Sequence, residues 1–575
     1  MDAARQVWLQ CGFGLGEAFL QAWAAWRDDA DRAPCLDFIA LSAQLPDAAT
    51  LRGAPHALAA ALAARWPPLT RNLHRLSFDD ARVRLLLAPG PLRDTLPALR
   101  AQVDRFLIDE LPDAQDPLRS ARALARLAAP LAGLRSAVDT PAWRHALASA
   151  GFELQLDSGG LEAIYRPRFT PRRQAAATQW HPPGEVAIVG AGLAGCALAA
   201  ALAEQGCSSQ LLDRAAAPAT GASGNPAGLF HGVVHGDDAP HARLHRAAAL
   251  RATRAVQDAL DAGAALGSTA GALRLDTRGR DAAAMRAELQ ALGLPAGYAQ
   301  ALDPTQAALR CGLPLAHPAW FFPGGGWVQP AGLARHYLAL AGRRVSFRGG
   351  VDVQALRRHE GRWHLLGHDG RTLAAADIVV LANATAAGAL AGLPAGWLQP
   401  VRGQLSAYRQ AQSPPGHALR LPTLPLAGAG YLLPDVQGLA VFGAMSQPGD
   451  DTAELRASDQ AANLARLRQL SPAVWPIDGV LPELLEGRVG WRCQSPDRLP
   501  LIGAVPVPGA GPAEALETAP RQPGLYLFNA LGSRGIAWSA FGAELLAAQL
   551  TGAPWPLEAS LARALDPARL LKRRT

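Results

Sequence analysis

The sequence contains almost no lysine: Lys572 is the only one, although lysine and arginine together number 55. The basic charge is therefore carried by arginine, and a formal net charge of +7 permits an anionic partner such as nucleic acid. A composition this rich in alanine and arginine is also what coding bias produces, so the charge alone decides little. Charged residues make up 18% and apolar residues 49% of the chain, which excludes a disordered protein.

Cysteine is also scarce, and no pair has the C-x-x-C spacing or the nearby histidines of a zinc site. We expect reduced thiols in a cytoplasmic protein without a metal. A signal peptide is not expected, because the N-terminus lacks a basic stretch followed by an apolar one. The longest apolar stretch, residues 379–398, is interrupted by Asn383, Thr385 and Pro394. A membrane span is therefore not expected either.

With 575 residues the chain is long enough for about three or four domain-sized units. The most informative stretch of the sequence is Glu185-Val-Ala-Ile-Val-Gly-Ala-Gly-Leu-Ala-Gly-Cys196. A short β-branched strand is followed by Gly190, Gly192 and Gly195 in G-x-G-x-x-G spacing, and the pattern then becomes helical. In a dinucleotide-binding unit these glycines make the turn, admit a pyrophosphate and let the helix pack on the strand.

An acid stands where such a unit needs one. The strand candidate Ser209-Gln-Leu-Leu-Asp213 ends in a carboxylate at about the expected distance of 20 residues from the turn, where it would bind a ribose. The pattern favours an adenine dinucleotide site for FAD or NAD over a glycine turn that serves packing alone.

Residues 1 to about 165 alternate strand and helix candidates, which predicts an open α/β sheet. A second glycine turn, with Gly12, Gly14 and Gly16, follows the first strand candidate, where a nucleoside ligand would bind. Such turns also occur without a ligand. Residues 166–183 are rich in arginine and proline and are interpreted as a linker, either solvated or touching a phosphate backbone.

The remaining segments suggest a second domain with an insertion. A hydrophobic strand at 377–383 is expected to return beside the first strand of the nucleotide unit, and strand-like pieces between about 397 and 450 predict an antiparallel substrate domain. Near the end, residues 525–535 repeat the order strand, small-residue turn, helix. The amides of Gly532, Ser533 and Gly535 could face the polar edge of a cofactor.

Several motifs resemble one known family. These are the glycine turn, Gly221-Ala-Ser-Gly-Asn225, Gly326-Trp-Val-Gln-Pro330, Val401-Arg-Gly-Gln404, Gly490-Trp-Arg-Cys493 and Ala530-Leu-Gly-Ser-Arg-Gly535. Together they resemble the bifunctional tRNA 5-methylaminomethyl-2-thiouridine biosynthesis (MnmC-type) family, over most of residues 184–575. In that family a methyltransferase is fused to an FAD-dependent oxidase similar to glycine and D-amino-acid oxidases.

The resemblance implies the fold and the chemistry. The fold class is α/β: a class I methyltransferase-like Rossmann domain at 1–165, the linker at 166–183, and at 184–575 an FAD-binding two-dinucleotide-fold domain with an inserted antiparallel β substrate domain. The reaction is oxidative removal of the carboxymethyl group from 5-carboxymethylaminomethyl-2-thiouridine at the wobble position of the tRNA anticodon loop. FAD takes a hydride beside a secondary amine and the imine hydrolyses.

The resemblance also assigns site residues. Arg492 would hold the substrate carboxylate through a bidentate pair, with a structural salt bridge as the alternative. Arg534 would contact the flavin or order its loop. The cofactor-binding set is Gly190, Gly192, Gly195, Asp213, Ser223, Asn225, Gly532, Ser533 and Gly535. No metal is expected, and the oligomeric state stays open.

The N-terminal half departs from the family. Its glycine turn (Gly12, Gly14, Gly16) and Asp109 are retained, but Ser42 replaces the acid that holds the ribose of S-adenosylmethionine. Gly90-Pro91 replaces a Gly-Asp pair, Glu110 replaces a glycine, Asp116-Pro117 replaces Asn-Pro, and Ser158-Gly-Gly-Leu-Glu162 replaces a basic loop. A lost ribose carboxylate removes hydrogen bonds worth roughly 1.5–3 kcal/mol. We therefore expect a degenerate domain that positions tRNA and has little methyltransferase activity.

Three functions stand at this point. The first is a tRNA-modifying flavin oxidase with a degenerate methyltransferase-like domain, and the second is the full bifunctional enzyme that also uses S-adenosylmethionine. The third is a glycine- or sarcosine-type oxidase of small molecules. The fusion favours the first two, because a small-molecule oxidase does not need a nucleoside-methyltransferase neighbour.

Overall fold

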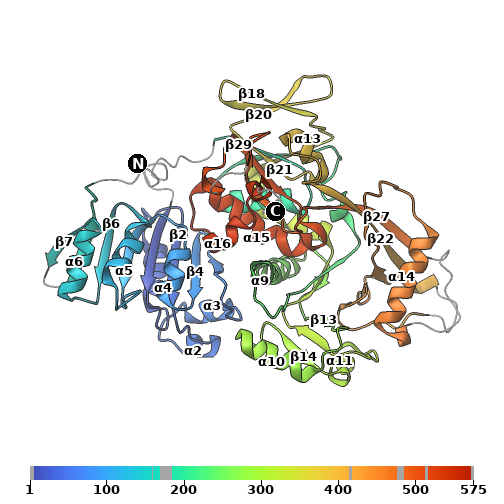
Figure 1. Ribbon diagram of the computed structural model, residues 1–575, viewed down its shortest axis with the longest axis horizontal. Coiled ribbons are helices and arrows are strands. Elements are labelled where there is room, and N and C mark those ends of the chain that lie inside the picture. The colour runs from blue at the N-terminus through green and yellow to red at the C-terminus, as the bar shows by residue number, and fades with distance from the viewer. Residues whose placement is uncertain are drawn as a thin grey trace. The chain divides into compact units, whose positions relative to one another are not determined.

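The computed structural model describes residues 5–157, 160–168, 184–412, 418–474, 485–511 and 516–571 (Figure 1). The chain divides into two compact units, residues 1–182 with 547–562, and residues 183–546 with 563–575. Most of the stretch interpreted as a linker, from 169 to 183, lies outside the described residues, and so do Ser158 and Gly159 of the altered N-terminal loop.

The first unit is built on one eight-stranded sheet in the order β3-β4-β2-β1-β5-β6-β8-β7. The five central strands from β4 to β6 are parallel, and each outer pair closes as an antiparallel hairpin. Strand order reverses between β1 and β5, as in doubly wound sheets. The α/β prediction is thereby confirmed. The strands are β1 (Gln6–Cys11), β2 (Leu36–Ser42), β3 (His74–Phe78), β4 (Val83–Pro89), β5 (Val103–Ile108), β6 (Ala128–Ser136), β7 (Phe152–Asp157) and β8 (Gly160–Tyr165).

Helices flank this sheet because its central strands are apolar on both faces. Every residue of β2 is buried, and two separate hydrophobic clusters lie on the sheet's two sides. Buried strands of this kind require cover on both faces. The helices are α1 (Glu17–Asp28), α2 (Ala48–Arg52), α3 (Ala59–Ala64), α4 (Leu92–Ala98), α5 (Pro117–Ala125), α6 (Pro141–Ser149) and the late α16 (Ala559–Arg563).

The second unit contains a six-stranded nucleotide sheet in the order β17-β10-β9-β21-β29-β28, parallel except for β28. The expected return of the chain is confirmed, since β21 pairs directly with β9. The strands are β9 (Val186–Val189), β10 (Ser209–Asp213), β17 (Val345–Gly349), β21 (Ile378–Leu381), β28 (Leu501–Pro506) and β29 (Arg521–Asn529). The associated helices are α8 (Leu193–Glu204), α9 (Pro240–Asp261), α12 (Pro330–Ala341), α13 (Ala387–Ala391) and α15 (Gly535–Thr551).

The inserted substrate sheet has nine strands, mainly antiparallel, with the path β14-β15-β13-β23-β24-β25-β22-β26 and with β27 also paired to β22. Helix α14 (Ala457–Leu470) lies beside β22 and β27 (Figure 1). The strands are β13 (Ala272–Leu275), β14 (Gln300–Leu302), β15 (Ala319–Phe322), β22 (Gln399–Arg409), β23 (Leu426–Ala427), β24 (Tyr431–Leu432), β25 (Leu439–Gly443), β26 (Gln447–Pro448) and β27 (Glu486–Gln494).

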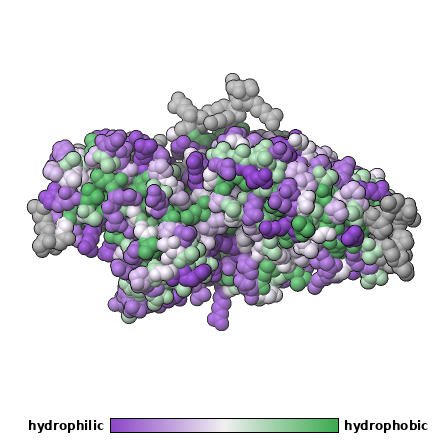
Figure 2. Space-filling view, turned by 90° about the horizontal axis from the view of Figure 1, so that it is seen from below, coloured by the Kyte–Doolittle hydropathy of each residue, from purple (hydrophilic) through white to green (hydrophobic). Residues whose placement is uncertain are grey.

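Smaller elements complete the second unit. Two further helices are α10 (Ala282–Leu292) and α11 (Pro304–Cys311). One three-stranded sheet joins β11 (Gly228–Phe230), β16 (Gly326–Val328) and β12 (Gly267–Ser268), and another joins β18 (Ala355–His359), β19 (Arg362–Leu366) and β20 (Thr372–Ala376). Hydrophilic and hydrophobic side chains are interspersed over the face in Figure 2. Among the described helices, none combines the length and the apolar character that crossing a membrane requires.

Candidate functional site

The glycine turn after β9 is shaped by close backbone approaches. Gly190 has φ of 107°, and a Cβ there would lie 2.7 Å from the Ala382 carbonyl oxygen at the end of β21. A Cβ on Gly195 would collide with the Gly190 carbonyl oxygen, so this glycine lets α8 pack against the turn. Gly192 is less crowded, because the atom nearest to a Cβ added there would be the Ser223 hydroxyl oxygen at 3.3 Å. Gly190 and Gly195 therefore cannot accept a side chain without moving the backbone around them.

Helix α8 presents its amino end at this turn. Its N-cap residue, Gly192, offers no side-chain acceptor, and the Ser223 hydroxyl accepts a hydrogen bond from the Leu193 amide at 3.1 Å. The helix is apolar on all sides and buried from Leu193 to Leu202. A buried helix of twelve residues suits an anionic group at its amino end, because the positive end of its dipole lies there and its N-cap residue brings no side-chain acceptor.

Asp213 lies at the end of β10, beside the turn. Its Oδ2 accepts from the Ala191 amide at 2.6 Å and its Oδ1 from the Ala215 amide at 2.8 Å. The carboxylate is thereby fixed against the glycine loop, and each oxygen keeps a lone pair for a further donor such as a ribose hydroxyl.

The segment 221–225 is tied to the substrate sheet by Arg488 of β27. The Arg488 guanidinium donates to the Asn225 side-chain oxygen at 2.6 Å and to the Thr220 and Gly221 carbonyls at 2.7 Å each. The Asn225 side chain therefore faces Arg488, while Ser223 faces α8. Sequence reasoning did not identify Arg488, although it stands on the same strand as Arg492.

The late turn lies next to the same strand. Residues Gly532–Arg534 form a short 3-10 helix that leads into α15, and Gln494 at the end of β27 forms a β-bridge with Leu531. A Cβ on Gly532 would face the Gln494 side chain at 3.4 Å. The turn and the strand of Arg492 therefore come together at one place, at the amino end of a buried helix.

Arg492 of β27 and Tyr431 of β24 lie within electrostatic range of each other in the substrate sheet. Burial lowers the pKa of the Arg492 guanidinium and raises the pKa of Tyr431 to about 12, and the two groups interact electrostatically. Among the described residues, the only side-chain hydrogen bond of Arg492 goes to the Met445 carbonyl at 3.3 Å, and it has no carboxylate partner. The salt-bridge alternative is thus not found there. Tyr431 was missed by the sequence analysis, because the segment Gly430-Tyr-Leu-Leu-Pro434 shows no alternation that would single it out.

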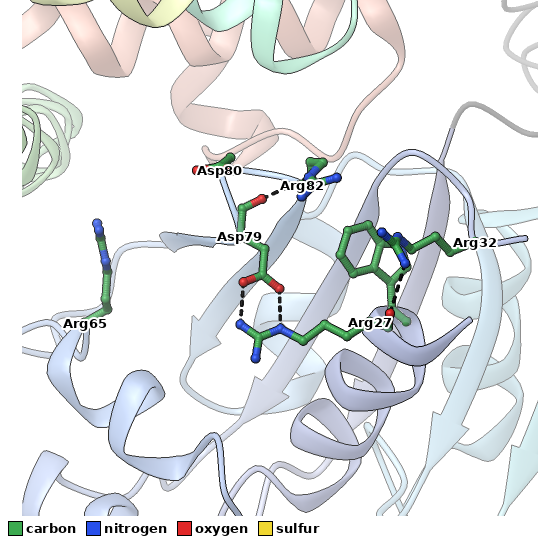
Figure 3. Close-up of a pocket in the computed structure, with 7 residues that line it drawn as sticks. Arg27, Arg32, Arg65, Asp79, Asp80 and Arg82 are labelled. Carbon is green, nitrogen blue, oxygen red and sulfur yellow. Dashed lines mark hydrogen bonds and ion pairs between the residues drawn. The ribbon is translucent and has the colours of Figure 1, made fainter. Parts of the chain in front are cut away.

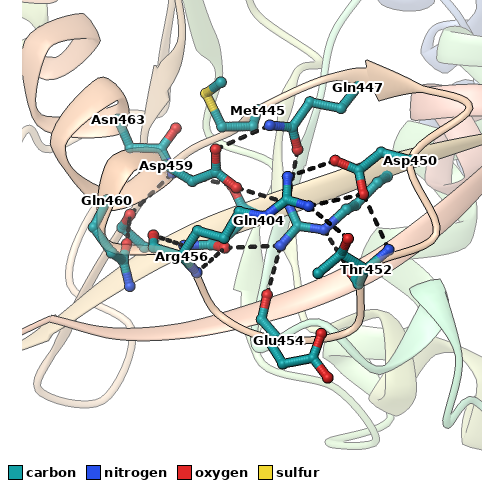
Figure 4. Close-up of polar contacts among 12 residues, drawn as sticks. Gln404, Met445, Gln447, Asp450, Thr452, Glu454, Arg456, Asp459, Gln460 and Asn463 are labelled. Carbon is teal, nitrogen blue, oxygen red and sulfur yellow. Dashed lines mark hydrogen bonds and ion pairs between the residues drawn. The ribbon is translucent and has the colours of Figure 1, made fainter.

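The neighbouring Arg402 shows the contrasting arrangement. It is fully buried and donates to the Asp459 carboxylate at 2.7 Å, to two side-chain amides (Gln404 at 3.1 Å and Gln447 at 2.7 Å) and to two carbonyls (Thr452 at 2.6 Å and Glu454 at 2.7 Å) (Figure 4). These contacts use all five N–H donors of the guanidinium. Arg402 is therefore structural, and it fixes the loop 445–456 beside Arg492.

A group of histidines lies near Arg534. His231 is buried, its Nδ1 lies 2.6 Å from the Gly232 carbonyl oxygen, and its ring stacks on Phe322. Burial, then the positive charges of Arg534 and Arg274, lower its pKa to about 3. Burial and Arg534 likewise lower the pKa of His245 to about 2. Both imidazoles are thus neutral at physiological pH.

The N-terminal glycine turn is arranged differently. A Cβ on Gly12 would lie 3.2 Å from the Asp109 Cβ, and one on Gly14 would lie 2.9 Å from the Glu17 carboxylate, which accepts from the Leu15 amide. Gly16 also has a positive φ, 83°. The Asp109 carboxylate accepts from the Gln10 amide at 2.6 Å. Carboxylates therefore surround this turn.

The side chains at the positions expected to hold a nucleoside form hydrogen bonds with nearby backbone groups or begin helices. The Ser42 hydroxyl bonds the backbone of Gln44, donating at 2.8 Å and accepting at 3.2 Å. Pro91 precedes α4, and the Asp116 side chain caps α5 by accepting from the Arg119 amide. None of these groups replaces the missing ribose acid.

A cavity of about 540 Å³ lies elsewhere in the first unit. It lies at the carboxyl end of α1 and at the turn between β3 and β4. This is the amino end of the parallel strands, whereas the glycine turn lies at their carboxyl end. Arg27 and Asp79 pair across it, with Arg27 Nε to Asp79 Oδ2 at 2.7 Å, while Arg65 stands apart from them (Figure 3). The other lining residues are Trp26, Arg32, Asp80 and Arg82. This cavity is not the nucleoside site predicted from the turn.

A metal centre has no candidate ligand set in the part of the chain that the structure describes. No group of three or more His, Cys, Asp or Glu side chains there is placed to hold an ion. None of the six cysteines, all of them within the described residues, forms a disulfide, and burial raises the pKa of Cys196 and Cys493 to about 12.

Comparison with known proteins agrees with this geometry. Residues 185–549 match the DAO family, described as FAD dependent oxidoreductase. A tRNA 5-methylaminomethyl-2-thiouridine biosynthesis bifunctional protein MnmC from Methylibium petroleiphilum is 43% identical over 594 residues, covering 98% of this chain and 90% of that protein.

Two solved structures share the fold of the second unit. Glycine oxidase from Geobacillus kaustophilus aligns with a TM-score of 0.52 at 21% identity, covering 69% of this chain and 100% of that one. Iminodiacetate oxidase from Chelativorans sp. BNC1 aligns with a TM-score of 0.50 at 25% identity, covering 66% and 98%. The D-amino-acid/glycine oxidase-like fold expected for the second unit is confirmed.

The residues present fit FAD. The Gly190–Gly195 turn would receive the pyrophosphate, Asp213 the ribose, and the late turn at 532–535 an edge of the flavin. The chain belongs to the FAD-dependent oxidoreductases of the DAO family and, over nearly its whole length, to the MnmC-type family of bifunctional tRNA 5-methylaminomethyl-2-thiouridine biosynthesis proteins.

Proposed function

We propose that the protein oxidises 5-carboxymethylaminomethyl-2-thiouridine at the tRNA wobble position and leaves the 5-aminomethyl base. FAD, when bound, supplies the acceptor for a hydride from the carbon between the amine and the carboxylate. The resulting imine takes up water and separates into the primary amine and a two-carbon oxo acid. The C–H and C–N bonds broken are those of the carboxymethyl group, and the two electrons leave with the hydride.

The observation that carries this proposal is the pair formed by Arg492 and Tyr431. A half-buried guanidinium without a carboxylate partner among the described residues can receive one from the substrate. Tyr431 stays protonated at neutral pH and can donate to the same carboxylate. Together they would orient the adjacent carbon toward the flavin.

The chemistry of the relatives supports the same substrate class. One structural neighbour is an iminodiacetate oxidase, and iminodiacetate is a secondary amine that bears carboxymethyl groups. The proposed base carries one such group on one such amine. The tRNA substrate is supported by the name of the relative that is 43% identical.

The test uses the purified holoprotein and its flavin absorbance under anaerobic conditions. Hypomodified tRNA is expected to bleach the flavin, and glycine is not. Bleaching by glycine with no response to tRNA would instead favour the small-molecule oxidase. Nucleoside mass spectrometry of tRNA from a complemented deletion strain then identifies the product: the aminomethyl base indicates oxidase activity alone, and the methylaminomethyl base indicates both activities.

The bifunctional alternative has support from the relative's name, which calls that protein bifunctional. The N-terminal site favours the oxidase alone, because β2 ends in Ser42 instead of an acid that could hold a ribose, and the Ser42 hydroxyl is engaged with Gln44. Isothermal titration of the full chain with S-adenosylmethionine distinguishes the two. Micromolar binding would contradict a degenerate domain.

The proposal also assigns a role to each part of the chain, a partner and a cellular location. Residues 1–165 act as a methyltransferase-like module that positions tRNA, the segment 166–183 connects it, and residues 184–575 carry the oxidase. The named residues Gly190, Gly192, Gly195, Asp213 and Ser223 hold FAD. The partner is the anticodon loop of a tRNA, and the activity is cytoplasmic.

A further inference from the structure

A buried polar atom at the carboxyl edge of the nucleotide sheet lacks a partner. The side-chain oxygen of Asn383, Oδ1, is buried and accepts no hydrogen bond in the part of the chain that the structure describes. Asn383 stands just after the end of β21. A buried acceptor without a donor costs free energy, so native proteins nearly always supply one. The donor for Asn383 must therefore come from a bound molecule.

Asn529, at the end of the neighbouring strand β29, shows the opposite arrangement. Its Oδ1 accepts from the Ala530 amide at 2.7 Å, and its Nδ2 donates to the Ala384 carbonyl at 2.9 Å. Because β21 and β29 are parallel neighbours, the two asparagines stand at the same edge of the sheet. Each is followed by an alanine with positive φ, 53° at Ala384 and 58° at Ala530. On two similar turns, the protein satisfies the oxygen of Asn529 and leaves that of Asn383 open.

Asn383 also lies against the glycine turn that follows β9. A Cβ on Gly190 would be 2.7 Å from the Asn383 Cα. The Ala382 amide donates to the Val189 carbonyl at 2.8 Å, which joins the ends of β21 and β9. On the other side, the Asn529 side chain fixes the turn from β29. The backbone that carries Asn383 is therefore held next to the turn that would receive the pyrophosphate.

The order of the strands gives the order of the cofactor's parts. Neighbouring strands run β10-β9-β21-β29. Asp213 at the end of β10 is assigned to the ribose, the glycine turn after β9 to the pyrophosphate, and the turn 532–535 after β29 to an edge of the flavin. The end of β21 lies between the last two, whose strands are two spacings or about 10 Å apart. In FAD the group between the pyrophosphate and the flavin is the ribityl chain, which carries hydroxyl groups.

We propose that Asn383 Oδ1 accepts a hydrogen bond from a ribityl hydroxyl of FAD. Asn383 is then a further cofactor-binding residue, outside the set that the sequence motifs assign. A hydroxyl is the donor that an amide oxygen requires, whereas the ionised pyrophosphate offers acceptors alone. This inference rests on the placement of FAD in the proposed function, and it is independent of the tRNA substrate.

The test uses the full-length apoprotein, from which the flavin has been removed, and compares FAD with 2′-deoxy-, 3′-deoxy- and 4′-deoxy-FAD. Dissociation constants are measured from the change in flavin fluorescence on binding. We expect the wild type to bind one of these analogues about tenfold more weakly than FAD, because the asparagine oxygen is then left unpaired. In Asn383→Ala, FAD should bind about tenfold more weakly than in the wild type, and that analogue should bind as tightly as FAD.

Gln522→Ala is the matched control. Gln522 is also an amide side chain of the nucleotide sheet, but it stands near the amino end of β29, where its Nε2 donates to the Ala391 carbonyl at 2.9 Å. It therefore lies at the sheet edge opposite Asn383. Gln522→Ala should keep the wild-type ratio of the two dissociation constants. A folding defect in either variant lowers the fraction of protein that binds flavin and leaves this ratio unchanged.

Two results would overturn the inference. One is a wild type that binds every analogue as tightly as FAD, a result that no variant's folding can affect. The other is an Asn383→Ala protein that keeps the wild-type ratio. The placement of the cofactor is tested separately with Gly195→Ala. If Gly195→Ala loses FAD while Asn383→Ala keeps the ratio, the glycine turn stands and the ribityl contact fails. If Gly195→Ala binds FAD normally, the placement itself fails.

Discussion

Arg402 and Asp459 form a buried ion pair with 2.7 Å between Nη1 and Oδ2, although they stand 57 positions apart in the chain. Asp459 also accepts from the Gln447 amide at 2.9 Å. The pair joins β22 to α14 and holds the loop between them. Because every donor of Arg402 is used, the arrangement stabilises the sheet edge from which Arg492 projects.

Removing one partner of this pair should be costly. Asp459→Ala leaves the Arg402 charge buried without compensation, and we expect a loss of about 3–5 kcal/mol in the free energy of unfolding. The measurement is urea unfolding followed by flavin fluorescence. Asp451→Ala, at an exposed position nearby, is the control and should change stability by less than about 0.5 kcal/mol. Similar values for the two variants would show that the ion pair does not support the loop.

The glycine turn gives a prediction about the cofactor. Gly195→Ala places a methyl group on the Gly190 carbonyl oxygen, so α8 must move away from β9. The protein should be purified with little flavin, measured as the ratio of flavin to protein absorbance. Gly388→Ala is the control, because a Cβ there meets only the Leu398 side chain at 3.9 Å, and it should retain the flavin. A full flavin content in Gly195→Ala would contradict the assignment of this turn.

The sequence predicts the parts of the fold that local patterns specify. The strand at 186–189, the G-x-G-x-x-G turn and Asp213 are close together in the chain, and the structure places them side by side as expected. Strands β22, β24 and β25 fall within the range from about 397 to 450 in which strand-like pieces were expected. Such features follow from period, turn chemistry and spacing, which one sequence contains.

The remainder depends on pairing between distant segments. Arg274 and Tyr431 lie on the same face of the substrate sheet because both pair with Ala427, which follows Arg274 by about 150 residues. Arg488 donates a hydrogen bond to Asn225 across 263 positions. No local pattern distinguishes these arginines from the many others in the chain. Their roles emerge from which donors are already used, and that information exists only in the folded protein.

Tyr431 gives a prediction about substrate recognition. Since its pKa is raised to about 12, the phenol keeps its proton and donates to the substrate carboxylate throughout the neutral and mildly alkaline range. Tyr431→Phe should lower kcat/KM for hypomodified tRNA by about 10- to 100-fold, the loss of one hydrogen bond to a charged group. Flavin content should be unchanged. Tyr526→Phe, a partly buried tyrosine of β29, is the control and should retain activity.

The two neutral histidines predict how stability depends on pH. The pKa of His231 is lowered to about 3 and that of His245 to about 2, whereas an unfolded chain has the ordinary value of 6.5. Above pH 6.5 both states are unprotonated, so the histidines cost nothing. As pH falls below 6.5 only the unfolded state takes up these protons, and stability decreases by about 1.4 kcal/mol per pH unit for each histidine until the folded pKa is reached.

Replacing one histidine should therefore flatten the acid side of the stability curve. His231→Gln carries no ionisable ring, so between about pH 6.5 and 4 its free energy of unfolding should fall less steeply than that of the wild type, by about 1.4 kcal/mol per pH unit. Any constant offset from lost packing on Phe322 shifts the curve without changing this slope. His359→Gln, at an exposed position, should reproduce the wild-type slope. Parallel curves for His231→Gln and wild type would mean that His231 takes up its proton as readily in the folded protein as in the unfolded chain, which would contradict its lowered pKa.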